Sequence, residues 1–266
     1  MLNMKRITIF ALLLLVIGIA GSLFTYQSYA DSGPVKEEML FNETITDIIV
    51  ESNNSKIEIL PSSDETAKVE FTLDSRNKSR YNLEAVVEHG TLNVKVKEKI
   101  LQFFNFDFNF KSVVTRVYLP EQTYDSVMAK TENGAVTIEN IAATSVTGES
   151  TNGSITMKSL NAQEIITKTE NGKINLVAVE GELRAQATNG QIKLETETID
   201  HPIDFETVNG KILIQTNEKP KNAEISVDVV NGSVNIFGEN NRHTVIGNGE
   251  NKISLHTVNG GITVGN

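Results

Sequence analysis

The chain of 266 residues contains no cysteine and no tryptophan. The absence of cysteine excludes disulfide scaffolds, thiol catalysis, cysteine-ligated zinc sites and a lipid anchor attached through cysteine. Five prolines beside eighteen glycines exclude collagen-like and proline-rich segments. Basic residues are few as well: 24 Lys and Arg stand against 34 Asp and Glu, for a formal charge of −10. This balance excludes a surface that tracks the phosphates of nucleic acids.

The first thirty residues have the features of an export segment. Lys5 and Arg6 precede an uncharged, mostly apolar stretch over residues 7–24, and residues 28–30 (SYA) match the pattern that a signal peptidase cleaves. The apolar stretch is also long enough to remain as a membrane anchor. Residues 1–30 are therefore predicted to be a signal peptide or an N-terminal membrane anchor. Both alternatives predict an extracytoplasmic protein, secreted or membrane-anchored, and the lack of cysteine is typical of Gram-positive exporters.

A polar spacer over residues 31–43 leads into a repeat that fills residues 44–266. An Asn-Gly pair recurs seven times, with apolar residues three and five positions after each Asn, an aliphatic residue six before it and a small residue two before it. Two degenerate copies lie around Asn54 and His89, which makes nine units. The seven asparagines are Asn133, Asn152, Asn171, Asn189, Asn209, Asn231 and Asn259.

Within each unit, apolar and polar positions alternate with a period of two, which predicts half-buried strands and an all-β fold. Asn-Gly between two strands is typical of a turn with left-handed backbone conformations. One architecture that fits is a β-solenoid (β-helix-like) of about nine units of roughly 19 residues each, in which equivalent residues stack. The alternative is an antiparallel β-meander of Asn-Gly hairpins. The solenoid is favoured because stacking explains why the same residue recurs in each column.

The units TENGAVTIENI, STNGSITMKSL and KTENGKINL resemble a bacterial β-strand-repeat domain of unknown function that is labelled "putative adhesin", and which includes LiaG-like envelope proteins. The resemblance covers nearly the whole chain, including the N-terminal export segment. It implies a β-strand-repeat fold and a link to the cell-envelope stress response. It implies no catalytic or ligand-binding residues, because the family has none established.

The outward positions of the repeat include the residues that could act together in catalysis. The column three positions before each Asn holds alternating charges, which indicates cross-strand pairs on a solvated face. Glu132 and Glu170 lie two units apart, about 10 Å, and are the candidate carboxylate pair of an enzyme acting on wall polysaccharide. The four histidines have no metal-ligand spacing, and no cofactor, metal or catalytic residue is predicted. The column three positions before each Asn contains Lys130, Glu149, Lys168, Gln186, Glu206, Asp228 and His256.

Residues 101–111 (LQFFNFDFNFK) hold five of the eleven phenylalanines of the chain. Four of them alternate with polar residues, as in a strand with one aromatic face. Such a strand either caps or covers the rod, or it exposes an aromatic patch for contact with a membrane, a glycan or a protein. The candidate contact residues are Phe103, Phe104, Phe106, Phe108 and Phe110.

These observations predict a non-enzymatic envelope protein that acts as an adhesin or interaction scaffold. Its expected partner is an envelope component or an envelope protein, with membrane contact through residues 7–24 if they are not cleaved, and no nucleic acid. One alternative is the solenoid enzyme acting on wall polysaccharide. Another is a self-assembling surface rod, because the chain ends within its last repeat unit without an evident polar cap.

Overall fold

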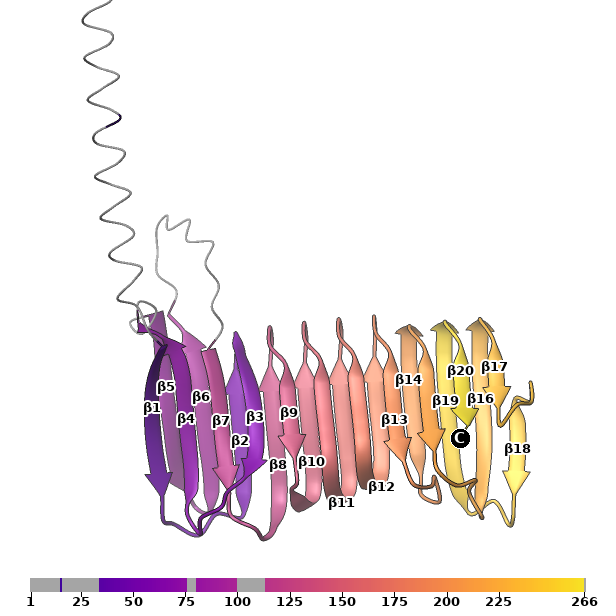
Figure 1. The fold of residues 1–266 in the computed structure, drawn as a ribbon, viewed down its shortest axis with the longest axis horizontal. Coiled ribbons are helices and arrows are strands. Elements are labelled where there is room, and N and C mark those ends of the chain that lie inside the picture. Colours follow the sequence, from indigo (N-terminus) through magenta and orange to yellow (C-terminus); the bar gives the residue numbers. More distant parts are fainter. Residues whose placement is uncertain (1–14, 16–33, 76–79, 100–112, 266) are drawn as a thin grey trace, which may run out of the picture.

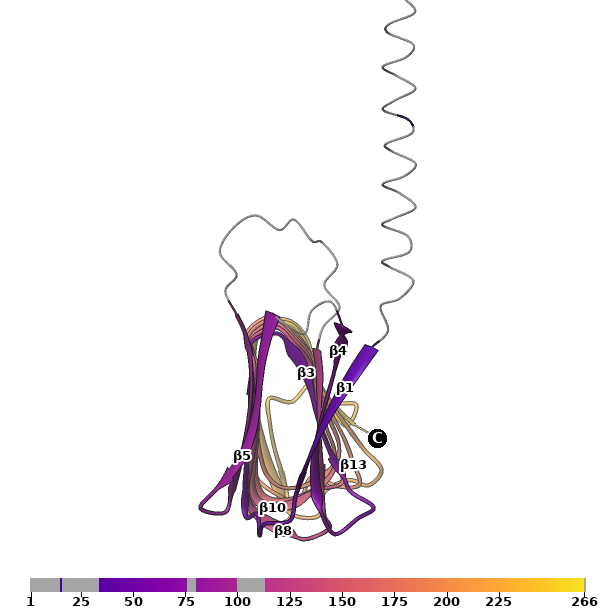
Figure 2. The same cartoon turned by 90° about the vertical axis from the view of Figure 1, so that its left-hand side faces the viewer.

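The computed structural model describes Leu15 and residues 34–75, 80–99 and 113–265, and these form a flattened β-solenoid. Each coil runs along one face to a turn and returns along the other, so two layers of strands lie back to back (Figures 1 and 2). Neighbouring coils pair in parallel, as Val146 does with Ile165. The predicted solenoid is therefore confirmed, and the antiparallel meander is wrong.

The predicted export segment, residues 1–30, lies outside the described residues except for Leu15. Among the residues that the structure describes, no helix has the length and apolar character needed to cross a membrane.

The strands that precede the turns form face A. All are parallel except the first and last, which pair antiparallel with their neighbours. In spatial order they are β5 (Tyr81–Glu88), β6 (Thr91–Glu98), β2 (Asp47–Ser52), β8 (Thr123–Thr131), β10 (Ala142–Ser150), the second parts of β11 (Ile155–Thr169) and β12 (Ile174–Ala187), β14 (Ile203–Asn209), β19 (Asn251–Asn259), β16 (Ala223–Asn231) and β18 (His243–Ile246).

The strands that follow the turns form face B. Here β1 and β4 pair antiparallel at the N-terminal end of the rod and the others are parallel. In spatial order they are β1 (Pro34–Phe41), β4 (Ala67–Asp74), β7 (Val113–Leu119), β3 (Ser55–Pro61), β9 (Val136–Glu139), the first parts of β11 and β12, β13 (Ile192–Thr196), β15 (Ile212–Thr216), β20 (Ile262–Gly265) and β17 (Val234–Ile236).

The spatial order of the coils differs from their sequence order at both ends of the rod. The coil β2–β3 lies between the β6–β7 and β8–β9 coils. The coil β19–β20 lies between the β14–β15 and β16–β17 coils. The described strands thus form nine parallel coils, the number that the repeat predicts. The expectation that the rod ends at an uncapped C-terminal unit is wrong, because β16 is outermost and pairs with β18, and Ile236 bridges to Glu239.

His89 does not belong to the column of turn asparagines. His89 and Gly90 join β5 to β6 in an antiparallel hairpin, and the Gly90 carbonyl accepts from the Thr46 N–H at 2.8 Å, at the edge opposite Asn54. The φ of 52° at His89 agrees with a turn residue in a left-handed conformation. The coil predicted around His89 is formed instead by β6 and β7.

The inward columns predicted from the repeat fill the space between the two faces. The aliphatic residues six positions before the turn Asn are at most 2% exposed from Val127 to Ile253. Phe71 and Phe205 are also fully buried, and the buried Tyr124 donates its hydroxyl to the Pro120 carbonyl at 2.7 Å. The core of the repeat coils thus consists of aliphatic side chains stacked from coil to coil.

The glycine after each turn Asn is required by close packing between coils, not by its backbone conformation. None of these seven glycines has a positive φ, so the predicted left-handed turn is wrong. A Cβ at Gly172 would lie 1.9 Å from the Gly153 carbonyl oxygen in the neighbouring coil. That oxygen also accepts the hydroxyl of Thr169 at 3.0 Å, which explains the small polar residue two positions before Asn171.

The left-handed residues lie at the opposite edge, seven positions after the turn Asn. Asn140, Ser159 and Ala178 have φ values of 55°, 52° and 49°. Alanine is strained in this conformation. We therefore expect Ala178→Gly to raise the free energy of unfolding by about 0.5–1 kcal/mol in urea titrations. Ala142→Gly, at the start of β10 without a positive φ, should lower it by about as much; a loss of stability in both variants would contradict the strain.

Candidate functional site

The turn asparagines form one row of side-chain hydrogen bonds along an edge of the rod, here called the Asn edge. Each Nδ2 donates to the Oδ1 of the Asn in the next coil, at 2.8–3.1 Å. Every predicted asparagine is in the row, and so is Asn54. Each interior amide uses a donor and an acceptor within the row, which makes its role structural. The spatial order is Asn231, Asn259, Asn209, Asn189, Asn171, Asn152, Asn133 and Asn54.

The row ends at a carboxylate near the N-terminal end of the rod. Asn54 Nδ2 donates to Glu98 Oε2 at 2.8 Å, and Glu98 Oε1 accepts from Arg80 Nη2 at 3.2 Å. All the amides of the row point their donors in this direction. The negative charge therefore lies where the aligned dipoles favour it, which couples the Asn row to the hairpin β5–β6.

Several chain segments meet the Asn edge at this same end, in a region here called the N-terminal corner. On face B, Pro34 pairs with Asp74, and Val113 begins β7 opposite Ser55. On face A, β6 ends at Glu98, beside Asn54. Figure 1 shows β1, β4, β6 and β7 gathered at this end of the rod. The corner is thus the place where residues 1–33 and 100–112 join the described strands.

The Phe-rich residues 101–111 lie outside the described residues, and so do all five candidate contact phenylalanines. Glu98 and Val113 flank the segment, and both lie at the N-terminal corner.

The outward column three positions before each turn position forms a continuous row of polar side chains across face A, here called the charge row. Its charges alternate in sign from Glu84 to Lys168. Lys130 Nζ lies 2.9 Å from Glu149 Oε2. The hydrogen bond to Glu149 and the negative charges of Glu149 and Glu51 raise the pKa of Lys130. His256 Nδ1 lies 3.1 Å from Asp228 Oδ2. In spatial order the row is Glu84, Lys95, Glu51, Lys130, Glu149, Lys168, Gln186, Glu206, His256 and Asp228.

Sequence analysis missed the first three members of this row. Glu51 could have been found by counting back from Asn54. Glu84 and Lys95 could not, because the column around His89 was assigned the wrong register. His256 was identified, but its position between Glu206 and Asp228 follows from the insertion of β19 between β14 and β16.

Glu132 and Glu170, the candidate carboxylate pair, lie in the turns that follow β8 and β11. Thr151, in the turn after β10, lies between them, as the repeat predicts. One oxygen of Glu132 accepts a hydrogen bond from Asn53 Nδ2 at 2.8 Å. Within the described part of the chain, no group of three or more His, Cys, Asp or Glu side chains could hold a metal ion.

A cluster of charges spans β3, β7 and β4 on face B. Arg116 Nε lies 2.6 Å from Glu58 Oε2, and its Nη1 lies 2.9 Å from Glu70 Oε1. Lys36 reaches Glu70 at 3.4 Å and Lys56 reaches Glu58. Burial alone would raise the pKa of Glu70, but hydrogen bonds from Arg116, Lys36 and Thr72 outweigh it and hold this pKa below its usual value. The cluster therefore stabilises the N-terminal end of the rod.

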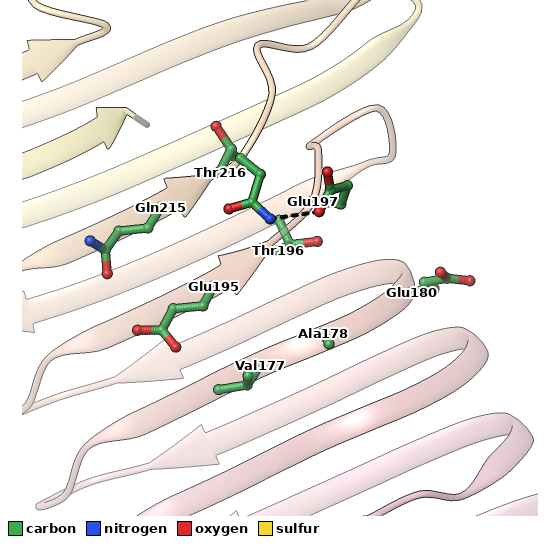
Figure 3. Close-up of a pocket in the computed structure, with 9 residues that line it drawn as sticks. Val177, Ala178, Glu180, Glu195, Thr196, Glu197, Gln215 and Thr216 are labelled. Atoms are coloured by element: carbon green, nitrogen blue, oxygen red, sulfur yellow. Dashed lines mark hydrogen bonds between the residues drawn. The ribbon is translucent and has the colours of Figure 1, made fainter.

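A pocket of about 510 Å³ lies on face B at the edge opposite the Asn row (Figure 3). Of its carboxylates, Glu195 and Glu197 come from the coil of β13, and Glu180 comes from β12. Glu195 pairs with Lys193, and Glu197 accepts from Asn217 Nδ2 at 2.6 Å. Figure 3 shows Glu180 at a separate coil corner, apart from these two. The carboxylates do not converge on one point, so the arrangement offers no acid–base pair.

The fold and these surfaces define an all-β solenoid repeat domain with a structural Asn row and no assembled catalytic group in its described part. A family model matches residues 45–180 and 161–265. The chain belongs to the Toastrack DUF4097 family, a domain of unknown function. No curated protein matches the chain.

Solved structures with similar folds come from several bacteria. A "putative cell adhesion protein" from Clostridium sporogenes is 16% identical over 87% of this chain and 99% of its own, with a TM-score of 0.40. A "putative adhesin" from Bacteroides fragilis is 14% identical over 87% and 96%, with a TM-score of 0.48. A "putative lipid binding protein" from Parabacteroides distasonis is 15% identical over 87% and 97%, with a TM-score of 0.32.

Proposed function

We propose that the chain is a non-enzymatic, extracytoplasmic envelope protein that contacts the cell surface through its N-terminal corner, as an adhesin or interaction scaffold used in envelope stress. The observation that carries this proposal is the shared position of Pro34, Glu98 and Val113 at that corner. Pro34 follows the predicted export segment, and the other two flank the Phe-rich residues 101–111. An N-terminal anchor would therefore hold Glu98 and Val113, which flank the Phe-rich residues in the sequence, at the membrane side of the rod.

The chemistry of the chain favours an apolar contact over an electrostatic one. The formal charge of −10 opposes binding to anionic lipids. Each phenylalanine side chain transferred out of water contributes about 1.5–3 kcal/mol. Three fully inserted phenylalanines would contribute up to about 9 kcal/mol, and an association cost of about 4 kcal/mol would leave binding in the range of tenths of a millimolar.

Co-sedimentation of residues 31–266 with liposomes, wall sacculi and protoplast membranes tests this function. These residues contain the whole core described here, which extends from Met39 to Val264. We expect binding to liposomes and protoplast membranes, and a loss of about tenfold or more in Phe106→Ser/Phe108→Ser.

The matched control is Val208→Ser/Val230→Ser, which removes exposed apolar side chains near the Asn edge at the other end of the rod. This variant should bind as the parent does. Absence of binding to all three targets, or equal binding by the phenylalanine variant, would overturn the proposed contact.

A further inference from the structure

The first six strands of face A carry a pattern that matches itself when it is rotated by 180°. These strands are β5, β6, β2, β8, β10 and the second part of β11. Two of their outward rows carry this pattern. One is the start of the charge row, and the other, here called the apolar row, lies two positions further from the Asn edge. The apolar row is Val86, Asn93, Ile49, Met128, Thr147 and Ile166.

The side chains of the apolar row face solvent in the described structure. Val86 and Met128 are 37% and 36% exposed, and Ile49 and Ile166 are partly exposed. The described strands pair only with their neighbours within the two layers, and none of them packs over the outside of this face. A row of aliphatic side chains in this position is unusual, because the solvent face of a strand normally carries polar residues.

We propose that this surface binds a second copy of the chain, face A to face A, about a two-fold axis that runs parallel to the strands between β2 and β8. Such an axis places each strand opposite the strand at the mirrored position of the six. An interface of this kind is isologous, so every contact occurs twice.

The charge row is complementary under this rotation. Glu51 faces Lys130 of the second copy, Lys95 faces Glu149, and Glu84 faces Lys168. All six charges of the row thus meet the opposite sign. Complementarity of this kind fixes the register of an interface and excludes others.

The apolar row matches under the same rotation. Ile49 faces Met128 of the second copy, Val86 faces Ile166, and the polar Asn93 faces Thr147. The charges and the apolar side chains are therefore both matched about the same axis.

Other positions of the axis match fewer strands. Moving the axis by one coil, to lie between β8 and β10, keeps Glu51 against Lys168 at the centre of the contact. It places Glu84 against Glu206 and Val86 against Asp204 at the outer strands. Moving it the other way leaves four strands in contact instead of six. At the rim of the proposed interface one pair is unfavourable, because Glu88 faces Glu164 of the second copy. Arg184 Nε lies 3.8 Å from Glu164 Oε1, and its positive charge reduces the repulsion between the two carboxylates.

The contact area fits a weak but specific dimer. Six strands about 4.8 Å apart and about seven residues along each strand give a patch of roughly 600 Å² per copy. Two patches bury about 1,200 Å² in total, which is the lower end of the range for specific interfaces. The proposal does not depend on export or on the Phe-rich residues.

Cross-linking between two single-cysteine variants tests the axis directly, because the chain has no cysteine of its own. In the proposed dimer Val86 faces Ile166 of the second copy, whereas Val86 lies about 24 Å from its own symmetry mate across five strand spacings. A bismaleimide of about 8–10 Å is suitable, because facing sheets pack about 10 Å apart. Val86→Cys and Ile166→Cys, made in residues 31–266 with tags of different size, should give a heterodimer when mixed.

Each single-cysteine variant alone should give at least about fivefold less product, because its two thiols would be too far apart for the reagent. Equal yields from the separate variants and the mixture would overturn the proposed axis. So would the absence of product from the mixture.

Sedimentation equilibrium of charge variants gives a second, independent readout. Glu51→Lys places lysine against Lys130 twice and should weaken dimerisation about tenfold or more. Glu51→Lys/Lys130→Glu disturbs the alternation within each chain but restores both contacts between chains, so it should return dimerisation to within about threefold of the parent. A parent that stays monomeric at about 0.5 mM, or a double variant as weak as the single one, would overturn the proposal and leave face A to a different partner.

Discussion

Gly172→Ala is expected to lower the free energy of unfolding by about 3 kcal/mol or more, with urea unfolding followed by circular dichroism as the measurement. The new Cβ would lie 1.9 Å from the Gly153 carbonyl oxygen and 2.6 Å from its carbon. Both atoms belong to backbone that is fixed by the neighbouring coil. The clash can therefore be relieved only by separating two coils, which also strains the hydrogen bonds of the Asn row.

Two further variants separate close packing from backbone conformation as the reason for this glycine. Gly265→Ala places a Cβ where no atom lies within 4 Å, and it should change stability little. Gly172→Asn would be tolerated better than Gly172→Ala if a left-handed turn were the requirement, because Asn adopts that conformation readily. Under close packing, Gly172→Asn is at least as destabilising as Gly172→Ala, and the opposite order would contradict the stacking.

The columns of the repeat could be predicted from the sequence because burial and stacking act on each coil separately. The strands, the inward residues and the number of coils follow from a period of two and from the Asn-Gly spacing. The order of the coils could not be predicted in this way. Ile203, Ile225 and Ile253 occupy the same column, so any of their coils fits beside any other in the same register.

Differences between the columns help to choose the order that is observed. In sequence order Glu206 would lie beside Asp228, and two like charges would face each other across neighbouring strands. Insertion of β19 places His256 between them instead. This effect is worth only tenths of a kcal/mol per pair, which is why a pattern search based on hydrophobic residues does not detect it.

The candidate surfaces also divide into those that the repeat predicts and those that depend on strands outside the repeat or on the order of the coils. The Asn row could be found from the spacing alone, because identical residues in one column must stack. The N-terminal corner could not, because it depends on β1, β4 and β5, whose antiparallel pairing lies outside the repeat. The self-matching pattern of face A also needs the true order of β6, β2 and β8, which is not their order in the sequence.

Arg116→Met is expected to cost about 2–3 kcal/mol at neutral pH, because it leaves Glu58 and the buried Glu70 with fewer partners. The pKa values of both carboxyl groups are held below 4.5 in the folded parent, where burial is outweighed by Lys56 and Arg116 at Glu58 and by Arg116, Lys36 and Thr72 at Glu70. Their contribution to stability is therefore present above about pH 4.5 and is lost as the pH falls through their folded pKa values.

In the Arg116→Met variant, burial acts on Glu70 with less opposition, so its folded pKa moves upward and protonation favours the folded state more than it does in the parent. The difference in stability between parent and variant should thus be largest near pH 7 and should shrink by more than half near pH 3, in urea titrations at both values. The matched control is Arg184→Met. Arg184 forms ion pairs with Glu182 and Glu164 on the solvent-exposed side of face A. The unfolding midpoint of this variant should stay close to that of the parent at both pH values. A difference for Arg116→Met that is constant with pH would show that the arginine acts through packing of its side chain rather than through the two carboxylates.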